Sequence, residues 1–366
     1  MPRPPGPVVL VLQGGGALGA YQAGVYQALH ESGIEPDWVI GTSIGAINAA
    51  LIAGNPVGLR QARLDAFWEL VAQRAPVLAP LAWPGLAPLW ANAQTVARGI
   101  PGFFAPNLAA LQGMDIPLGV ENAAWYRTTP LHDTLLQLLD TPHIGRLPTR
   151  LTVGAVHAGT GAMRYFDSRD TVLSVEHIMA SGALPPAFPA VRIDGEPYWD
   201  GGLYSNTPLE AVFDDSPRRS ALVFAVNVWQ QSGPEPQTIT QVLARQKDIQ
   251  YASRDESHIA RQQQLHRLRH IIRAMHKQMP PKLRDDPEVQ ALADWGCGTT
   301  MHVVRLLAPA LPGEDASKDI DFSLAGITAR RQAGYADTIG MLQRAPWTTP
   351  ADPLEAVVVY QDAARS

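Results

Sequence analysis

The sequence predicts an α/β fold with a mostly parallel central sheet flanked by helices, and the N-terminal segments carry the evidence. The run Val8–Leu12 is apolar without interruption, which is typical of a strand buried on both faces. A glycine-rich turn, a helical segment at residues 20–30 and a second short apolar run at residues 37–40 follow. Residues 44–53 are small and apolar throughout, as in a buried helix. Strand, turn and helix, twice in succession, is the order of a parallel α/β sheet.

Later segments continue this sheet. Residues 151–156 predict another strand, and residues 163–167 predict a partner that pairs with it as a hairpin. Residues 177–181 predict a short helix. A second hairpin over residues 191–199 has its turn at Asp194-Gly195, a dipeptide that favours tight hairpins. The run at residues 222–228 is the last segment that we predict to be a core strand.

The composition of the chain indicates two parts. Residues 8–230 form the α/β part, and residues 235–366 form a mainly helical C-terminal extension after the break at Ser232-Gly233-Pro234. Within the first part, residues 56–130 are rich in Trp and interrupted by Pro, which predicts an irregular helical insertion that is either a cap or an ordinary subdomain. Residues 238–278 predict one long helix whose basic face is either solvated or rests on anionic lipid.

Charge and cysteine content exclude several classes of protein. The 366 residues include 29 basic and 34 acidic side chains, without Lys/Arg-rich blocks, so we expect no nucleic-acid partner. The single cysteine, Cys297, excludes an intrachain disulfide and a cysteine-based metal site. Asp214-Asp215 and Asp285-Asp286 lack the spacing of metal ligands, and we expect neither a metal nor another cofactor.

The apolar runs are short. The run at residues 8–12 is below the roughly 7–15 apolar residues of a signal peptide, and no window reaches the ~18 of a membrane span. We therefore expect a cytoplasmic protein, with peripheral contact to a membrane as the further option. The sequence does not predict an oligomeric state.

A candidate nucleophile lies in the motif Gly41-Thr42-Ser43-Ile44-Gly45, between a predicted strand and a predicted helix. This context is that of a nucleophile elbow, in which small residues on either side of a tight turn expose the serine hydroxyl. The N-terminus of the following helix favours the developing negative charge. Ser43 is therefore the predicted nucleophile, with Gly41 and Gly45 as the supporting glycines.

The first glycine-rich turn, Gly14-Gly15-Gly16-Ala17-Leu18-Gly19, also joins a strand to a helix. A dinucleotide-binding turn would have this form, but it expects an acidic residue at the end of the next strand, and that strand ends in Ile40-Gly41. An oxyanion hole, in which bare backbone N–H groups face a reacting carbonyl, fits acyl transfer better. Its candidates are Gly14, Gly15, Gly16 and Ala17.

Asp200, followed by Gly201 and Gly202 directly after the predicted hairpin, is a third candidate element of the site. A serine nucleophile requires a base, normally a histidine oriented by a carboxylate, and the ten histidines leave such a triad open. In an α/β-hydrolase the order along the chain is Ser, acid, His. The histidines that would satisfy this order are His258, His266, His270, His276 and His302. Four of these five fall in the predicted long helix, where an ordinary surface histidine is expected.

The order of four segments, GGGALG, GTSIG, ASGALPPAFPAV and DGG, resembles a patatin-like phospholipase domain over roughly residues 8–228. The resemblance implies a three-layer patatin-like sandwich and a catalytic Ser43–Asp200 dyad without histidine. It assigns the oxyanion hole to the turn at Gly14, Gly15, Gly16 and Ala17, with Gly19, Gly201 and Gly202 as supporting glycines. Leu18 departs from the pattern, because many members have Arg or Lys at this position.

The resemblance implies hydrolysis of a lipid or small ester through an acyl-enzyme intermediate, as in a phospholipase A or a carboxylesterase. Residues 319–335 resemble an extension that follows the patatin domain in a bacterial subgroup, which adds intracellular hydroxyalkanoate esters as an alternative substrate class. From a different class, a non-catalytic dinucleotide-binding or scaffold protein remains the competing hypothesis.

Overall fold

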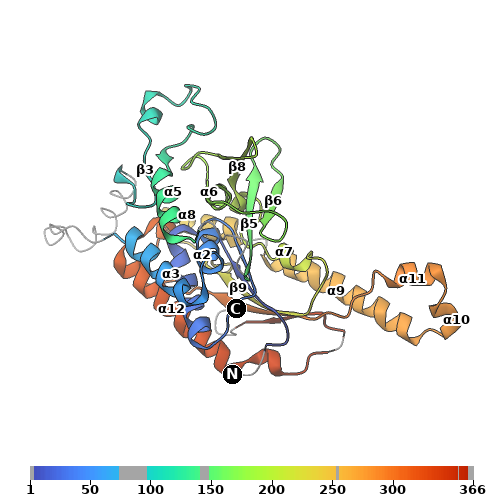
Figure 1. Ribbon diagram of the computed structural model, residues 1–366. Coiled ribbons are helices and arrows are strands. Elements are labelled where there is room, and N and C mark those ends of the chain that lie inside the picture. The colour runs from blue at the N-terminus through green and yellow to red at the C-terminus, as the bar shows by residue number, and fades with distance from the viewer. Residues whose placement is uncertain (1–3, 74–96, 141–147, 253–254, 353, 362–366) are drawn as a thin grey trace.

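The computed structural model describes residues 4–73, 97–140, 148–252, 255–352 and 354–361. One sheet of nine strands runs through the centre of the molecule, in the order β11-β10-β9-β1-β2-β5-β8-β7, with β6 paired to β5 on a side branch (Figure 1). The parallel strands are β1 (Val8–Leu12), β2 (Trp38–Gly41), β5 (Arg150–His157), β9 (Ala221–Asn227), β10 (Met301–Leu307) and β11 (Val357–Tyr360).

Antiparallel pairs complete the sheet on the β5 side. They involve β6 (Met163–Asp167), β7 (Val191–Ile193) and β8 (Glu196–Asp200). The turn between β7 and β8 places both Asp194 and Gly195 at positive φ, 52° and 86°, as a tight hairpin turn requires. A separate two-stranded ladder joins β3 (Ala105–Pro106) and β4 (Tyr126–Arg127).

Side chains of the central strands alternate between two apolar layers. Leu10 and Leu12 belong to a layer shared with α1 (Ala20–Glu31), α2 (Ile44–Ala53), α3 (Val57–Val71) and α12 (Leu324–Arg344). Val9 and Val11 belong to the opposite layer, shared with α7 (Glu210–Phe213) and α9 (Asp255–Gln278). Because β1 is buried on both faces, it reads as an uninterrupted apolar run. The predicted helix–sheet–helix layering is confirmed.

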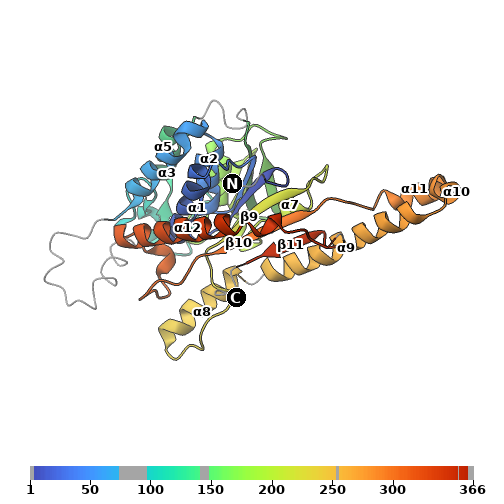
Figure 2. The same ribbon diagram turned by 90° about the horizontal axis from the view of Figure 1, so that it is seen from below.

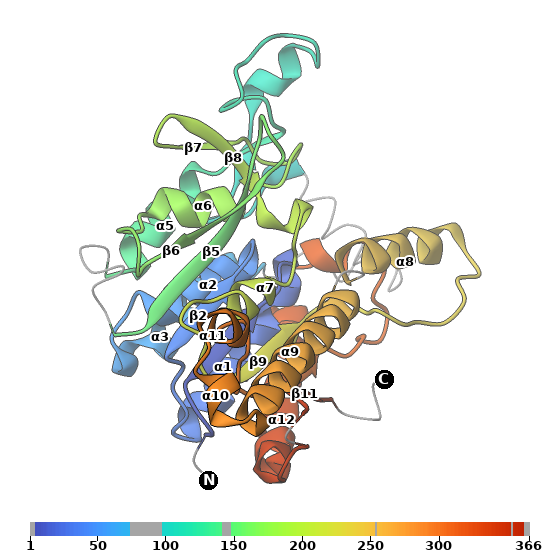
Figure 3. The ribbon, with the colours of Figure 1, turned by 90° about the vertical axis from the view of Figure 1, so that its right-hand side faces the viewer.

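The other described α-helices are α5 (Thr129–Leu138), α6 (Val175–Ser181), α8 (Ile239–Ala252), α10 (Pro281–Arg284) and α11 (Pro287–Ala293). The distal part of α9 extends away from the sheet as an arm that α10 and α11 complete, while α8 projects on a different side of the molecule (Figures 2 and 3). Of the described helices, none is both long and apolar enough to cross a membrane.

The C-terminal part differs from the prediction in two respects. The single helix predicted over residues 238–278 is two helices, α8 and α9. The part also contributes β10 and β11 to the central sheet, beyond the strand that we predict to be the last. In β10 the polar residues His302 and Arg305 interrupt the apolar pattern that identifies the other strands. The division of the chain near residue 230 stays a prediction.

The predicted insertion at residues 56–130 begins with α3, whose Trp68 is buried in the core. Its later residues form the ladder of β3 and β4 and a short 3-10 helix, Leu108–Gln112. Trp83 and Trp90 lie outside the described residues. The described part of the insertion therefore contributes both to the core and to the wall of the cavity that holds Ser43.

Candidate active site

Ser43 lies on the turn between β2 and α2, at the carboxyl end of a parallel strand. Its backbone has φ 57° and ψ −127°, a conformation that L-residues rarely adopt and that costs on the order of 1–3 kcal/mol. The turn is tight, because a Cβ at Gly41 would overlap the Gly45 carbonyl and a Cβ at Gly45 would overlap the Leu12 carbonyl. The local geometry is that of the predicted elbow, with the α2 N-terminus directly behind the serine.

A second serine anchors this turn. The Ser43 N–H donates to the carbonyl oxygen of Ser181 at 3.0 Å and lies 3.1 Å from its Oγ. Ser181 Oγ in turn donates to the Gly154 carbonyl oxygen on β5 at 2.6 Å. The sequence predicts no role for Ser181, because its contact with the Ser43 turn depends on the position of α6 beside that turn.

Asp200 is the last residue of β8, which is separated from β2 by β5 in the sheet, and it lies beside Ser43. Its carboxylate accepts a hydrogen bond from the Ser43 side chain and another from the Gly202 N–H, at 3.0 Å to Oδ1. The side chain is only 2% exposed. Burial without a cationic partner disfavours the charged form, and it raises the pKa of Asp200 to about 7 despite both hydrogen bonds. A carboxyl group poised near neutrality is what general-base catalysis requires.

The first glycine-rich turn faces the same point. The Gly14 N–H donates to the Asn206 carbonyl oxygen at 3.2 Å, so it already has a partner. Gly15 precedes the 3-10 helix Gly16–Gly19, whose first residues are Gly16 and Ala17. The first N–H groups of a helix have no partner within the helix and are therefore available to an anion. Gly14, Gly15 and Gly16 line one cavity with Ser43 and Asp200.

This cavity has a volume of about 260 Å³, and its walls are mainly apolar. Aromatic rings in mutual contact form part of its wall. Phe104 packs on Tyr126 with 4.8 Å between ring centroids, and Phe103 packs on Phe322 at 5.7 Å. The visible end of the insertion supplies three of these rings. A polar corner joined to an aromatic chamber suits a substrate with one reactive polar group and an apolar tail.

Residues from the C-terminal part complete the cavity. Tyr251 of α8 lines it together with Asp319, Ile320 and Phe322. The Tyr251 carbonyl oxygen accepts hydrogen bonds from the side chains of Gln13, at 3.3 Å, and Asn206, at 3.2 Å. These wall residues could not be assigned to the site from the sequence, because their neighbours in space are remote in the chain.

Histidine is absent from the cavity as far as the described residues extend. His266 is buried beside Phe213, with 5.9 Å between ring centroids, in the opposite layer of the sheet. His302 lies on β10, where its ring nitrogen is 2.9 Å from the Tyr360 hydroxyl. Within the described residues, no group of three His, Cys, Asp or Glu side chains is arranged to hold a metal ion.

In this α/β protein a strained serine turn, a buried aspartate and a glycine-rich turn line one cavity, and such groups are suited to ester hydrolysis. The chain belongs to the patatin-like phospholipase family, a family of enzymes that hydrolyse ester bonds. Residues 10–213 match the model described as patatin-like phospholipase, and residues 249–354 match a second model described as patatin phospholipase. The second match covers much of the C-terminal part.

Comparison with individual proteins gives more limited matches. A segment of 46 residues is 61% identical to lysophospholipase nte1 of Aspergillus terreus, and this segment is 13% of the present chain and 3% of the fungal protein. Among solved structures, VipD from Legionella pneumophila matches with a TM-score of 0.37 and 15% identity, over 92% of this chain and 67% of that one. ExoU in its complex with SpcU from Pseudomonas aeruginosa matches with a TM-score of 0.29 and 18% identity, over 96% and 65%.

Proposed function

We propose that this protein is a lipid acyl hydrolase in which Ser43 is the nucleophile and Asp200 the general base. The observation that carries the proposal is the hydrogen bond from Ser43 to a buried carboxyl group whose pKa lies near 7. A carboxylate with an ordinary pKa is too weak a base to activate a serine hydroxyl at neutral pH. Burial raises the pKa and makes the carboxylate a stronger base. Membership of the patatin-like phospholipase family supports the same reaction class.

The proposed reaction has two halves. Ser43 Oγ attacks the ester carbonyl carbon while Asp200 takes its proton, and the carbonyl oxygen becomes an oxyanion. Collapse of this intermediate breaks the ester C–O bond, and Asp200 returns the proton to the leaving alcohol. In the second half Asp200 removes a proton from water, which attacks the acyl-enzyme carbonyl. Ser43 leaves, regains its proton, and the carboxylic acid is released.

The oxyanion would be held by backbone N–H groups of the first glycine-rich turn. Because the Gly14 N–H already donates to Asn206, we narrow the proposed donors to Gly15, Gly16 and Ala17. Losing one such donor typically costs ~2.7–4 kcal/mol in the transition state. Gly14 is then required for space and not as a donor, since a Cβ there would overlap the Asn206 side chain and crowd Ser43.

The aromatic chamber favours an acyl chain as the bound part of the substrate. Phe103, Phe104, Tyr126 and Phe188 provide apolar surface and few polar groups that would recognise a sugar, a nucleotide or a peptide. A fatty acyl ester is therefore the proposed substrate class. Leu18 is buried and unavailable for contact with a head group.

A series of p-nitrophenyl esters from acetate to palmitate, and phosphatidylcholine vesicles analysed for released fatty acid, test this proposal. We expect turnover that increases with acyl length beyond acetate and disappears in Ser43→Ala, with the thermal unfolding of the variant showing that it is folded. Preference for acetate would replace the lipid substrate by a short ester. Equal turnover by wild type and Ser43→Ala would remove Ser43 from the mechanism.

A further inference from the structure

The segment Lys318–Phe322, which belongs to the C-terminal part, lies directly against the first glycine-rich turn. Gly16 has φ +55°, and a Cβ at this position would overlap the carbonyl oxygen of Asp319. Asp319, Ile320 and Phe322 also line the cavity that holds Ser43. The C-terminal part therefore contacts the backbone that carries the proposed oxyanion donors, in addition to covering the site.

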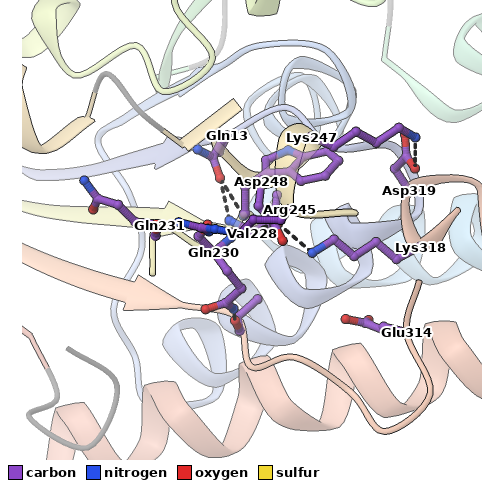
Figure 4. Close-up of polar contacts among 12 residues, drawn as sticks. Gln13, Val228, Gln230, Gln231, Arg245, Lys247, Asp248, Glu314, Lys318 and Asp319 are labelled. Atoms are coloured by element: carbon purple, nitrogen blue, oxygen red, sulfur yellow. Dashed lines mark hydrogen bonds and ion pairs between the residues drawn. The ribbon is translucent and has the colours of Figure 1, made fainter. Parts of the chain in front are cut away.

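Two ion pairs fasten this segment to α8, and they cross between neighbouring residues. The Lys318 ammonium lies 2.7 Å from Asp248 Oδ1, and the Lys247 ammonium lies 2.8 Å from Asp319 Oδ1 (Figure 4). The first pair is buried, with side chains 7% and 12% exposed, while the second is more open, at 37% and 21%. Each pair joins residues about seventy positions apart in the chain.

The α8 side of this connection is itself held to the end of β9. The Gln230 N–H donates to Asp248 Oδ1 at 3.2 Å, and Arg245 donates to the carbonyl oxygens of Gln230 and Gln231 (Figure 4). Asp248 therefore accepts from both Lys318 and the backbone of the core. Asp248 thus fixes the segment that contacts Gly16 relative to the backbone after β9.

A second line of contacts reaches the turn from the other side. The Lys318 ammonium lies 5.3 Å from the ring centroid of Trp229, and the Trp229 Nε1–H donates to the Gly14 carbonyl oxygen at 2.7 Å. The side-chain oxygen of Gln13 accepts from the N–H groups of Val228 and Trp229 (Figure 4). Lys318 is therefore linked to the glycine-rich turn in two ways. It is the chain neighbour of Asp319, whose carbonyl faces Gly16, and its ammonium lies over the ring of Trp229, which donates to Gly14.

We propose that Lys318 and Asp248 are positioning residues for the oxyanion hole, and that this is the catalytic role of the C-terminal part. The inference rests on the proposed function. A buried ion pair contributes little net stability compared with apolar residues of the same volume, but it fixes geometry through directional hydrogen bonds. An oxyanion hole needs such control, since a displacement of about 1 Å in an active site lowers the rate by about 100-fold.

The test compares Lys318→Met with Arg150→Met in the full chain. Arg150 pairs with Asp167 at 2.7 Å in a similarly buried setting, but it lies at the opposite end of β5 from the site. In Lys318→Met we expect kcat on the preferred ester to fall by about 10–100-fold while KM stays within about twofold of wild type, because the oxyanion exists only in the transition state. In Arg150→Met we expect wild-type kcat. Lys318→Met loses one ion pair and Arg150→Met loses two, to Asp167 and Asp215, and thermal unfolding measures what each loss costs.

A second variant keeps the inference testable if Lys318→Met does not fold. Lys247→Met removes the more exposed pair, and we expect it to lower kcat by a few-fold without a change in KM. Wild-type kcat in Lys318→Met, or in Lys247→Met where only that variant folds, would overturn the inference while Ser43→Ala stays inactive. An equal loss of kcat in Arg150→Met would overturn it as well. Absence of ester hydrolysis by wild type would instead remove the proposed function, and the inference with it.

Discussion

The N-terminal and C-terminal parts of this protein contribute to one cavity in different ways. The N-terminal part supplies the groups proposed to react, Ser43, Asp200 and the glycine-rich turn, each at the end of a strand or shortly after it. The C-terminal part supplies walls and supports, and reaches the cavity through ion pairs and backbone contact. Reactive groups can be recognised in short motifs. Their supports are defined by long-range contacts, and loss of a support should cost less than loss of a reactive group.

The largest effect is expected for Asp200→Asn in the N-terminal part. The amide cannot accept the serine proton, so we expect kcat to fall by about 10⁴-fold, comparable to the loss of the acid in a catalytic triad. The hydrolysis of the preferred ester, followed to a detection limit at least this low, measures the loss. A variant with wild-type kcat would show that another residue is the base.

The same variant has an expected effect on stability in the opposite direction. Because the pKa of Asp200 is raised to about 7 in the folded state, the folded protein binds this proton more tightly than the unfolded chain does. The ionised group therefore lowers the free energy of unfolding increasingly as pH rises from its unfolded pKa toward 7. We expect Asp200→Asn to unfold at a higher temperature than wild type at pH ~8, and by a smaller margin at pH ~5.

A smaller loss is expected at the boundary between the two parts. In Gly16→Ala the new Cβ meets the Asp319 carbonyl and the backbone φ of +55° is unfavourable, so the turn must shift. We expect kcat to fall by about 10²–10³-fold, the cost of one oxyanion donor. Gly33→Ala is the matched control, since Gly33 also has positive φ but its Cβ would meet nothing within 4 Å. If both substitutions had the same effect on kcat, the contact with Asp319 would be irrelevant.

The pH dependence of the reaction tests the burial of Asp200 without any substitution. The carboxylate is the active form, so kcat/KM should increase about tenfold per pH unit below the pKa and level off above it. The inflection is expected near pH 7, where burial places the pKa of Asp200. An inflection near the ordinary value of a carboxyl group would mean that the base is solvated. The profile of Lys318→Met should keep the wild-type inflection, because its proposed effect is on the oxyanion.

The smallest effect is expected in the cavity wall. Phe322 packs on Phe103 and on Trp68, where the ring centroids are 6.3 Å apart, so Phe322→Leu enlarges the chamber while leaving the reacting groups in place. We expect a shift of a few-fold in kcat/KM toward longer acyl chains in the ester series. Phe213→Leu, a buried substitution in the opposite layer of the sheet, controls for general loss of packing. An unchanged chain-length preference in Phe322→Leu would place the acyl chain elsewhere.

The central parallel strands of the N-terminal part could be predicted because they are buried on both faces. The runs at residues 8–12 and 222–228 are continuous apolar segments, and a glycine-rich turn follows the first of them. The later strands β10 and β11 escaped prediction. In β10, His302 and Arg305 interrupt the apolar run, and the strand tolerates them because they form hydrogen bonds with Tyr360 and Gln361. These partners are distant in the chain, so hydrophobic periodicity alone does not predict the strand.

The candidate site shows the same limit. Ser43 and Asp200 were singled out from the residues and from the family resemblance, and the structure brings them together. Ser181 and Trp229 border the site through hydrogen bonds to backbone, which can be formed by many residue types and leave no motif. Lys318 looks like any surface lysine in the sequence, yet it is buried by pairing with a residue seventy positions away.

The most direct test of the account is the rate and position of covalent labelling by a fluorophosphonate, which mimics the oxyanion. The account predicts a single adduct on the peptide that contains Ser43, absent in Ser43→Ala and formed much more slowly in Asp200→Asn and Lys318→Met than in wild type. Peptide mapping by mass spectrometry locates the adduct, and intact mass follows its rate. An adduct on another residue, or one that forms at the wild-type rate in Asp200→Asn, would contradict a dyad of Ser43 and Asp200.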